Sequence, residues 1–331
     1  MTFLPPGERI DGTTAECAHL HLLLACFRAS PPPMRLPDVT GWPLPELLGT
    51  TLIDKDVFST GHAVVAARYD RLGVRALLPL ERVWVGTRSA APPGSVRAWG
   101  GFHHPAQGYR HIQMDAAVTV FGDLAGRTPV SPQSVALDLV RSYAHDCLHY
   151  ATFRQYRLTG RGEIARVQYG INFRQPDGRT YSAADAPVDG PTRNLGILME
   201  GATDAEATAI ARQTAGYCQI TSLDPDPGVP GLALADATGT LTVDRIEAAL
   251  TSGHPYMRSL GRFGRTVTMR YRELLAELER GPGEAHGQFI AAMISGDLAP
   301  LEAWLDTRHG PDSFARLFRA PSFDAEPELV R

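Results

Sequence analysis

Cysteine is scarce in this sequence, and its spacing excludes a disulfide scaffold. The chain has 331 residues and four cysteines, at positions 17, 26, 147 and 218. No two of them form a CxxC pair, and four cysteines are too few for disulfide bonds to hold together a chain of this size. We therefore predict four reduced thiols in a cytoplasmic protein, with Cys147 acting as a small apolar residue.

Clustered positive charge is also missing. Lys55 is the only lysine, the arginines are scattered, and the net charge of the chain is -4. A protein that binds nucleic acid through its phosphates usually carries a basic patch or stripe. The charge pattern therefore predicts no nucleic-acid partner.

Long apolar runs are absent as well. The first twelve residues, MTFLPPGERIDG, contain prolines and acidic residues where a signal peptide needs a basic segment and an apolar run. The apolar stretch from His19 to Phe27 is far too short to span a bilayer. We predict no membrane partner.

Apolar residues are nevertheless plentiful enough for a substantial core. They make up 44% of the chain, against 21% charged residues, which is typical of a globular protein of one large or two modest domains. We predict a boundary near residue 128. Residues 1–128 would hold an N-terminal helix, a proline-rich linker and a β-rich lobe, and residues 129–331 would hold metal-binding helices and a helical C-terminal lobe.

The first part of the chain predicts one helix followed mainly by strands. A threonine at 13 or 14 can cap a helix that ends at Ala29, before a run of prolines. Residues 30–50 contain six prolines and indicate a linker crossing the surface. Short β-branched and aromatic runs over 51–86 and 111–124 favour strands, with one short helix at most.

The second part predicts helices around a hairpin. Ser131-Pro132 opens a helix through about residue 156, and residues 165–183 read as two strands joined by a Pro-Asp-Gly turn. Asn194 can cap a second long helix over 195–216. The chain after 242 is mostly helical, and 224–239 reads as a loop. The order predicts an α+β fold.

The chemistry is carried by two histidines four residues apart. His145 and His149 lie in HDCLH on the first long helix, so both imidazoles leave the same face one turn apart. Such a pair can hold one tetrahedral metal ion. With 11 histidines in 331 residues, chance gives roughly 0.4 pairs at this spacing. The adjacent Asp146 occupies the slot that holds the proton-accepting Glu in helical HExxH sites.

A third ligand is available on the second long helix. Glu200 and Asp204 stand four apart in LMEGATD and share one face. An acid ligand followed one turn later by a carboxylate suits a metal site, because a ligating histidine usually donates its free N–H to such a group. Gly201, beside the ligand, leaves room for another helix to approach closely.

Taken in order, HDCLH, a hairpin and NLGILMEGATD resemble the gluzincin (thermolysin-like) zinc metallopeptidases over roughly residues 130–215. The resemblance implies a zincin-like fold and hydrolysis of a peptide or small amide substrate. It implies Zn²⁺ bound by His145, His149 and Glu200, with Asp146 as general base and Asp204 orienting His145.

The sequence departs from the gluzincin pattern in two ways. Asp146 replaces the glutamate of the family, and 50 residues separate His149 from Glu200, a longer gap than in the best-known members. An acid shorter by one methylene implies a shifted water, or a site that binds metal with little peptidase activity.

Gluzincins place a donor for the oxyanion downstream of the ligand helix. The sequence offers four residues for this role without choosing among them, namely Tyr217, His254, Tyr256 and Tyr271. Three further histidines, His103, His104 and His111, precede the first long helix and are weaker ligand candidates.

Two other functions remain open on the sequence. His145-Asp146 is also the dyad of HD-type metal-dependent phosphohydrolases, with His111 as the earlier histidine and Asp204 as the final acid. That superfamily is all-helical, whereas 111–124 and 164–183 read as strands. The third reading is a catalytically silent, zinc-stabilised binding protein, which the aspartate at 146 motivates.

Overall fold

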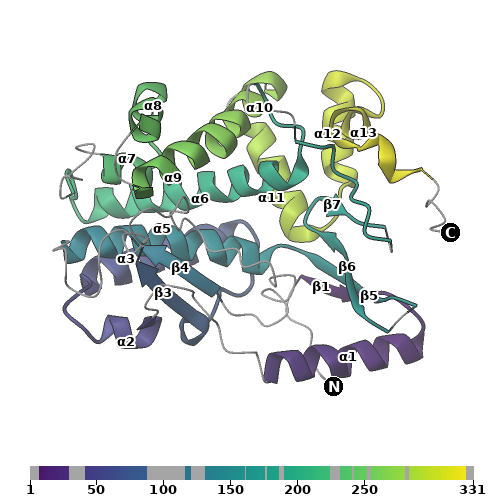
Figure 1. The fold of residues 1–331 in the computed structure, drawn as a ribbon, viewed down its shortest axis with the longest axis horizontal. Coiled ribbons are helices and arrows are strands. Elements are labelled where there is room, and N and C mark those ends of the chain that lie inside the picture. Colours follow the sequence, from purple (N-terminus) through teal and green to yellow (C-terminus); the bar gives the residue numbers. More distant parts are fainter. Residues whose placement is uncertain are drawn as a thin grey trace. The chain divides into compact units, whose positions relative to one another are not determined.

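The chain is a mixed α and β structure with two small sheets among many helices (Figure 1). The coarse α+β prediction is therefore confirmed. The computed structural model describes residues 7–29, 42–87, 116–120, 131–160, 162–175, 177–185, 190–223, 232–240, 242–251, 255–279 and 283–325.

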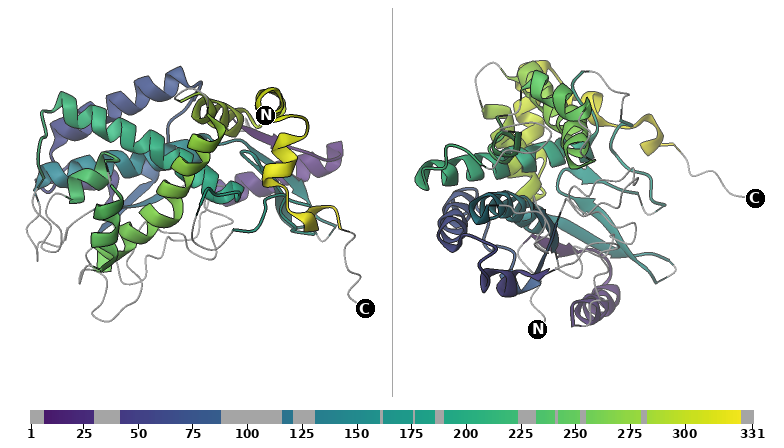
Figure 2. Two further views of the ribbon diagram at one scale, coloured as in Figure 1. Left: turned by 90° about the horizontal axis from the view of Figure 1, so that it is seen from above. Right: turned by 60° about the vertical axis from the view of Figure 1, so that its left-hand side comes forward.

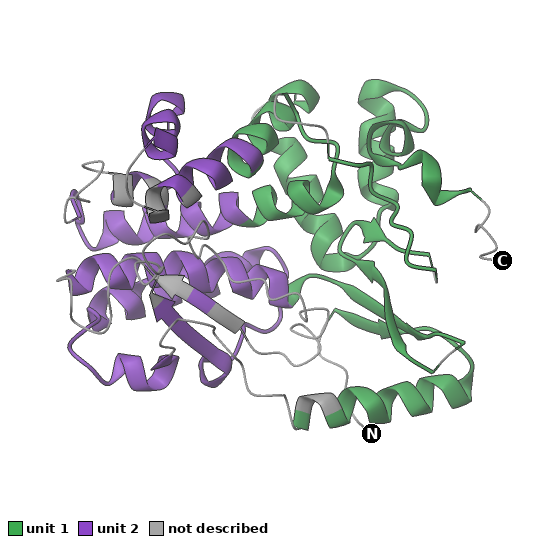
Figure 3. Ribbon diagram, viewed as in Figure 1, with its two compact units in different colours: residues 1–29, 151–203, 267–331 green, residues 30–150, 204–266 purple. Residues whose placement is uncertain are grey.

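The fold divides into two compact units, each assembled from separate stretches of chain (Figure 3). Unit 1 comprises 1–29, 151–203 and 267–331, and unit 2 comprises 30–150 and 204–266. Neither unit ends at residue 128. Helices α5 (Pro132–Ala151) and α6 (Leu195–Tyr217) each run without a break from one unit into the other.

The sheet of unit 1 has the order β1-β5-β6-β7. Strand β1 (Glu8–Ile10) is parallel to β5 (Arg154–Leu158), and the following pairs are antiparallel. Helix α1 (Thr14–Ala29) packs on β5 (Figure 2). Strands β6 (Ile164–Tyr169) and β7 (Asn172–Phe173) form a hairpin closed by two residues.

Helices complete unit 1. They are α10 (Arg270–Leu278), α11 (Glu284–Ser295), α12 (Ala299–His309), α13 (Ser313–Phe318) and the short η4 (Pro321–Phe323). Phe318 is fully buried and packs edge-on against Phe289, joining α13 to α11. The prediction of a mostly helical chain after residue 242 is confirmed.

Unit 2 holds a three-stranded sheet in the order β2-β3-β4. Strand β3 (Val83–Thr87) is antiparallel to β2 (Trp42–Pro43) and parallel to β4 (Ala116–Val120). The helices of this unit are α2 (Leu44–Leu48), α3 (Lys55–Arg71), η1 (Leu80–Arg82), α7 (Leu232–Ala237), α8 (Val243–Thr251) and α9 (Pro255–Phe263). A π-helical segment, η3 (Gly264–Met269), joins α9 to α10.

Helix α5 lies in the core of unit 2 and is buried on nearly all sides. A Cβ at Gly61 of α3 would lie 2.3 Å from a methyl of Val140, so glycine permits the close approach of these helices. The Tyr69 hydroxyl donates to the Ala144 carbonyl at 2.7 Å. Packing of this density fixes the rotation of α5 about its own axis, and therefore the direction in which its histidine side chains point.

Several local predictions are wrong. Residues 62–70, predicted as a strand, belong to α3, because Asp54 caps that helix and apolar residues recur along it at helical spacing. Helices thus account for most of the described residues before 128, where a β-rich lobe was predicted. The first long helix ends at Ala151, and the next residues form β5 because they pair with β1 and β6.

Three shorter segments also differ from prediction. The linker predicted over 30–50 contains β2 and α2, and the loop predicted over 224–239 contains α7. The single strand predicted over 165–173 folds back at Gly170, whose φ of +53° suits glycine.

No helix in the described ranges is both long and apolar enough to cross a membrane.

Candidate metal centre

The histidine pair is presented by the C-terminal half of α5. His149 is buried and His145 is half-buried. Their Nε2 atoms lie 3.0 Å apart, with the rings edge to face. Two nitrogens, each at 2.0–2.1 Å from a tetrahedral metal ion, are separated by about 3.3 Å. The pair therefore already has nearly the separation that one shared ion requires.

Glu200 of α6 contributes the third donor. Helix α6 begins where predicted, because the Asn194 side chain accepts a hydrogen bond from the Ile197 N–H at 3.1 Å. One ligand atom each from His145, His149 and Glu200 lies within 4.8 Å of the other two. Two imidazole nitrogens and one carboxylate oxygen form a donor set typical of zinc, so these residues fit the metal that the motif implies.

The two aspartates of the motif are both buried. Asp146 is 8% exposed and directly follows His145 on α5. Asp204 is 5% exposed, and its Oδ1 accepts a hydrogen bond from Arg141 at 3.0 Å. Because Arg141 belongs to α5 and Asp204 to α6, the two motif helices meet within unit 2.

Arg141 was missed by the sequence analysis. Its guanidinium also lies 3.8 Å from Asp138, so two buried carboxylates share one buried cation. A signal was available, because Arg141 precedes His145 by one helical turn and continues the stripe of His145 and His149. Arg141 fixes the carboxylate of Asp204 against α5.

Tyr271 of α10 lies against the turn of α6 that carries Glu200. A Cβ built on Gly201 would be 2.5 Å from the Tyr271 Cβ, which only glycine permits. This confirms the close helix approach predicted at Gly201. Tyr271 is 2% exposed, and its hydroxyl lies 2.7 Å from Nδ1 of His286 on α11. All four residues belong to unit 1.

The other oxyanion candidates have different surroundings. Tyr217, at the end of α6, is 65% exposed, and its hydroxyl accepts a hydrogen bond from Gln213. Tyr256 lies on α9, with its side chain outside the described part. His254 also lies outside the described residues, as do His103, His104 and His111.

The environment of Cys147 agrees with its predicted apolar role. Burial raises the pKa of the Cys147 thiol to about 12, so the thiol is protonated at neutral pH. Burial also raises the pKa of the neighbouring Tyr143 hydroxyl, which donates to the Leu78 carbonyl at 2.7 Å. Cys147 is thus a neutral, close-packed part of the core between the two histidines.

No protein family, curated protein or solved structure matches this chain. What can be said of its class therefore comes from the site itself. The site consists of two imidazoles one turn apart on a buried helix and a carboxylate from a second helix. The resemblance to gluzincins remains a prediction based on the HDxxH and ExxxD motifs.

Proposed function

We propose that this chain is a zinc-dependent hydrolase of peptide or amide bonds. The observation that carries the proposal is the proximity of one ligand atom each from His145, His149 and Glu200, within 4.8 Å of one another. Three protein ligands leave a fourth tetrahedral position open, which is the pattern of catalytic zinc sites, whereas structural sites have four protein ligands.

Zn²⁺ bound to these residues would acidify water and polarise the scissile carbonyl. The carboxylate of Asp146, next to His145 in the chain, would accept the proton of the attacking water and pass it to the leaving amine. Asp204, held by Arg141, would orient an imidazole of the pair.

Tyr271 is the oxyanion donor that the described surroundings favour. It is buried, and it packs on the residue that follows Glu200, whereas Tyr217 is exposed. The hydrogen bond to His286 supports this role when Nδ1 of His286 carries the proton and donates to the tyrosine oxygen. In that tautomer the tyrosine oxygen accepts from His286, and its O–H would donate to the oxyanion of the substrate.

The decisive experiment combines metal analysis with a substrate screen on the purified full chain. We expect about one zinc per chain, together with turnover of an amide substrate from a peptide library. Turnover of phosphoesters alone would favour an HD-type phosphohydrolase. Stoichiometric zinc without turnover would favour a metal-stabilised binding protein, and absence of any bound metal would refute the proposal.

A further inference from the structure

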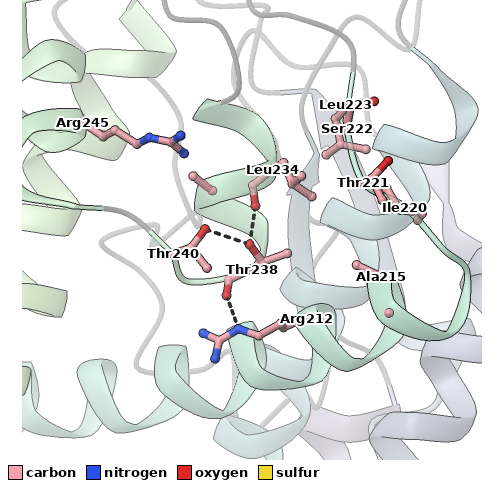
Figure 4. Close-up of a pocket in the computed structure, with 12 residues that line it drawn as sticks. Arg212, Ala215, Ile220, Thr221, Ser222, Leu223, Leu234, Thr238, Thr240 and Arg245 are labelled. Carbon is pink, nitrogen blue, oxygen red and sulfur yellow. Dashed lines mark hydrogen bonds between the residues drawn. The ribbon is translucent and has the colours of Figure 1, made fainter.

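A second site lies in unit 2, in a pocket of about 680 Å³ between the end of α6, the segment after it, α7 and the start of α8 (Figure 4). None of the three metal-centre residues lines this pocket. Its lining residues are Arg212, Ala215, Gly216, Ile220, Thr221, Ser222, Leu223, Leu234, Ala235, Thr238, Thr240 and Arg245.

One wall of the pocket is a tightly built helix cap. Helix α7 ends at Ala237, and the φ of +66° at Gly239 in the turn that follows allows the Thr240 N–H to donate back to the Ala235 carbonyl at 2.8 Å. A Cβ at Gly239 would lie 2.6 Å from the hydroxyl of Thr208 on α6, so the cap is pressed against that helix. The wall is thereby fixed in position.

The cap also positions one of the two arginines. Nε of Arg212 donates to the Thr238 carbonyl at 2.9 Å, which orients the guanidinium and leaves its two terminal amino groups for other partners (Figure 4). Thr240 adds a hydroxyl beside it, 3.2 Å from that of Thr238. An arginine tethered through Nε has already lost part of its side-chain entropy, which lowers the cost of binding a ligand.

The charged side chains among the described lining residues have one sign. Arg212 and Arg245 both line it, and none of the twelve lining residues is acidic. Within the described ranges, neither arginine forms an ion pair, although many other arginines of this chain do. Two guanidinium groups that pair with no described carboxylate produce a positive potential that attracts an anion.

The rest of the lining is apolar and sets the size of the ligand. Ala215, Ile220 and Ala235 are buried lining residues, and Leu223 and Leu234 add further apolar surface to the lining. The volume lies within the range of small-molecule sites and is much larger than an inorganic ion needs. We propose that this pocket binds a small organic anion, a carboxylate or phosphate group carried on a short apolar body.

The test is a calorimetric titration of the purified full chain with each of four probes. Pentanoate and butyl phosphate each combine an anion with an apolar body, inorganic phosphate has only the charge, and 1-pentanol has only the apolar chain. We expect one of the two organic anions to bind more tightly than both inorganic phosphate and 1-pentanol. The comparison of pentanoate with butyl phosphate distinguishes the two sources of charge.

Charge-removing variants assign the binding to this pocket. Arg245→Gln and Arg212→Gln should each weaken binding of the preferred anion by about tenfold or more, since a charge-assisted hydrogen bond is lost. Arg75→Gln removes the same charge from an exposed arginine outside the pocket and should change nothing. Arg245→Gln should fold even if Arg212→Gln does not, because the Arg245 guanidinium forms no ion pair or hydrogen bond with a described residue.

Either of two results would overturn the proposal. One is equal affinity for the organic anion in wild type and in both pocket variants, with Arg75→Gln as the reference. The other is no saturable binding of either organic anion at millimolar concentration to a chain shown by circular dichroism to be folded. Because the probes are assayed by binding, both results are independent of metal content and of hydrolysis.

Discussion

The side chain of Tyr271 occupies the space that a side chain at position 201 would need. A Cβ on Gly201 would lie 2.5 Å from the Cβ and 2.6 Å from the Cγ of Tyr271. These residues are 70 positions apart in the chain, and their contact holds α10 against the turn of α6 that carries Glu200. Tyr271 in turn reaches His286 through its hydroxyl. The contact suggests two tests, one of stability and one of chemistry.

The stability test compares two glycines of the same helix. Gly201→Ala should destabilise the fold by about 1–3 kcal/mol, because the added methyl overpacks the contact with Tyr271. Gly216→Ala has open space around its Cβ and should stabilise the chain by about 0.4–1 kcal/mol. Urea denaturation of both variants measures the difference. Equal effects at the two positions would mean that α10 does not press on α6 at Gly201.

The chemical test compares two tyrosines. Tyr271→Phe keeps the ring against Gly201 and removes only the hydroxyl, so kcat should fall on the order of 10²–10³-fold if that hydroxyl stabilises the oxyanion. Tyr217→Phe is the matched control, because Tyr217 is exposed, and it should retain full activity. Loss of activity in Tyr217→Phe alone would show that Tyr217, and not Tyr271, donates to the oxyanion.

Metal binding should depend on all three proposed ligands. His149→Ala and Glu200→Gln should each weaken zinc binding by more than the roughly 10–100-fold that loss of a supporting hydrogen-bond partner causes. His19→Ala and Glu273→Gln are controls on exposed helix positions and should bind zinc like wild type. Competition with a chromogenic chelator measures the affinities. Unchanged affinity in Glu200→Gln would remove α6 from the site.

Asp146 decides whether the site is an active enzyme. Asp146→Asn is nearly isosteric but accepts no proton, so zinc content and fold should persist while the rate falls on the order of 10²–10⁴-fold. Asp146→Glu restores the side chain of the gluzincin motif and should keep or raise turnover if the buried site has room for one methylene. Steady-state kinetics on a confirmed substrate measure both variants. Full activity of Asp146→Asn would show that another group is the base.

His62 of α3 should make stability depend on pH. Burial lowers the pKa of His62, whose ring stacks on Tyr143 at 5.7 Å between centroids. The unfolded chain then binds the proton more readily than the folded chain. The contribution of His62 to the free energy of unfolding is therefore complete above the usual pKa of 6.5, and it is lost as the pH falls toward the lowered pKa. His62→Phe should therefore gain stability relative to wild type on acidification, measured by urea denaturation. A pH-independent difference would contradict the assignment.

Predictions from the sequence succeeded where the deciding interactions are local. The spacing of His145 and His149 follows from helix geometry alone, and the cap at Asn194 satisfies backbone groups three residues away. The misread α3 also had local signals. Asp54 is a good cap, and Val57, Gly61 and Val65 recur at helical spacing, but the β-branched residues in the run favoured a strand.

The tertiary structure decided what local spacing leaves open. No residue near Ala151 stops the first long helix, and β5 forms there because β1, almost 150 residues earlier, offers a parallel partner. The choice of Tyr271 over Tyr217 depends on which tyrosine is buried against Gly201. The sequence by itself determined which residues could serve as metal donors, because their order and spacing on two helices are properties of the chain itself. Their neighbours come from distant segments, and only packing of those segments against each other selects them.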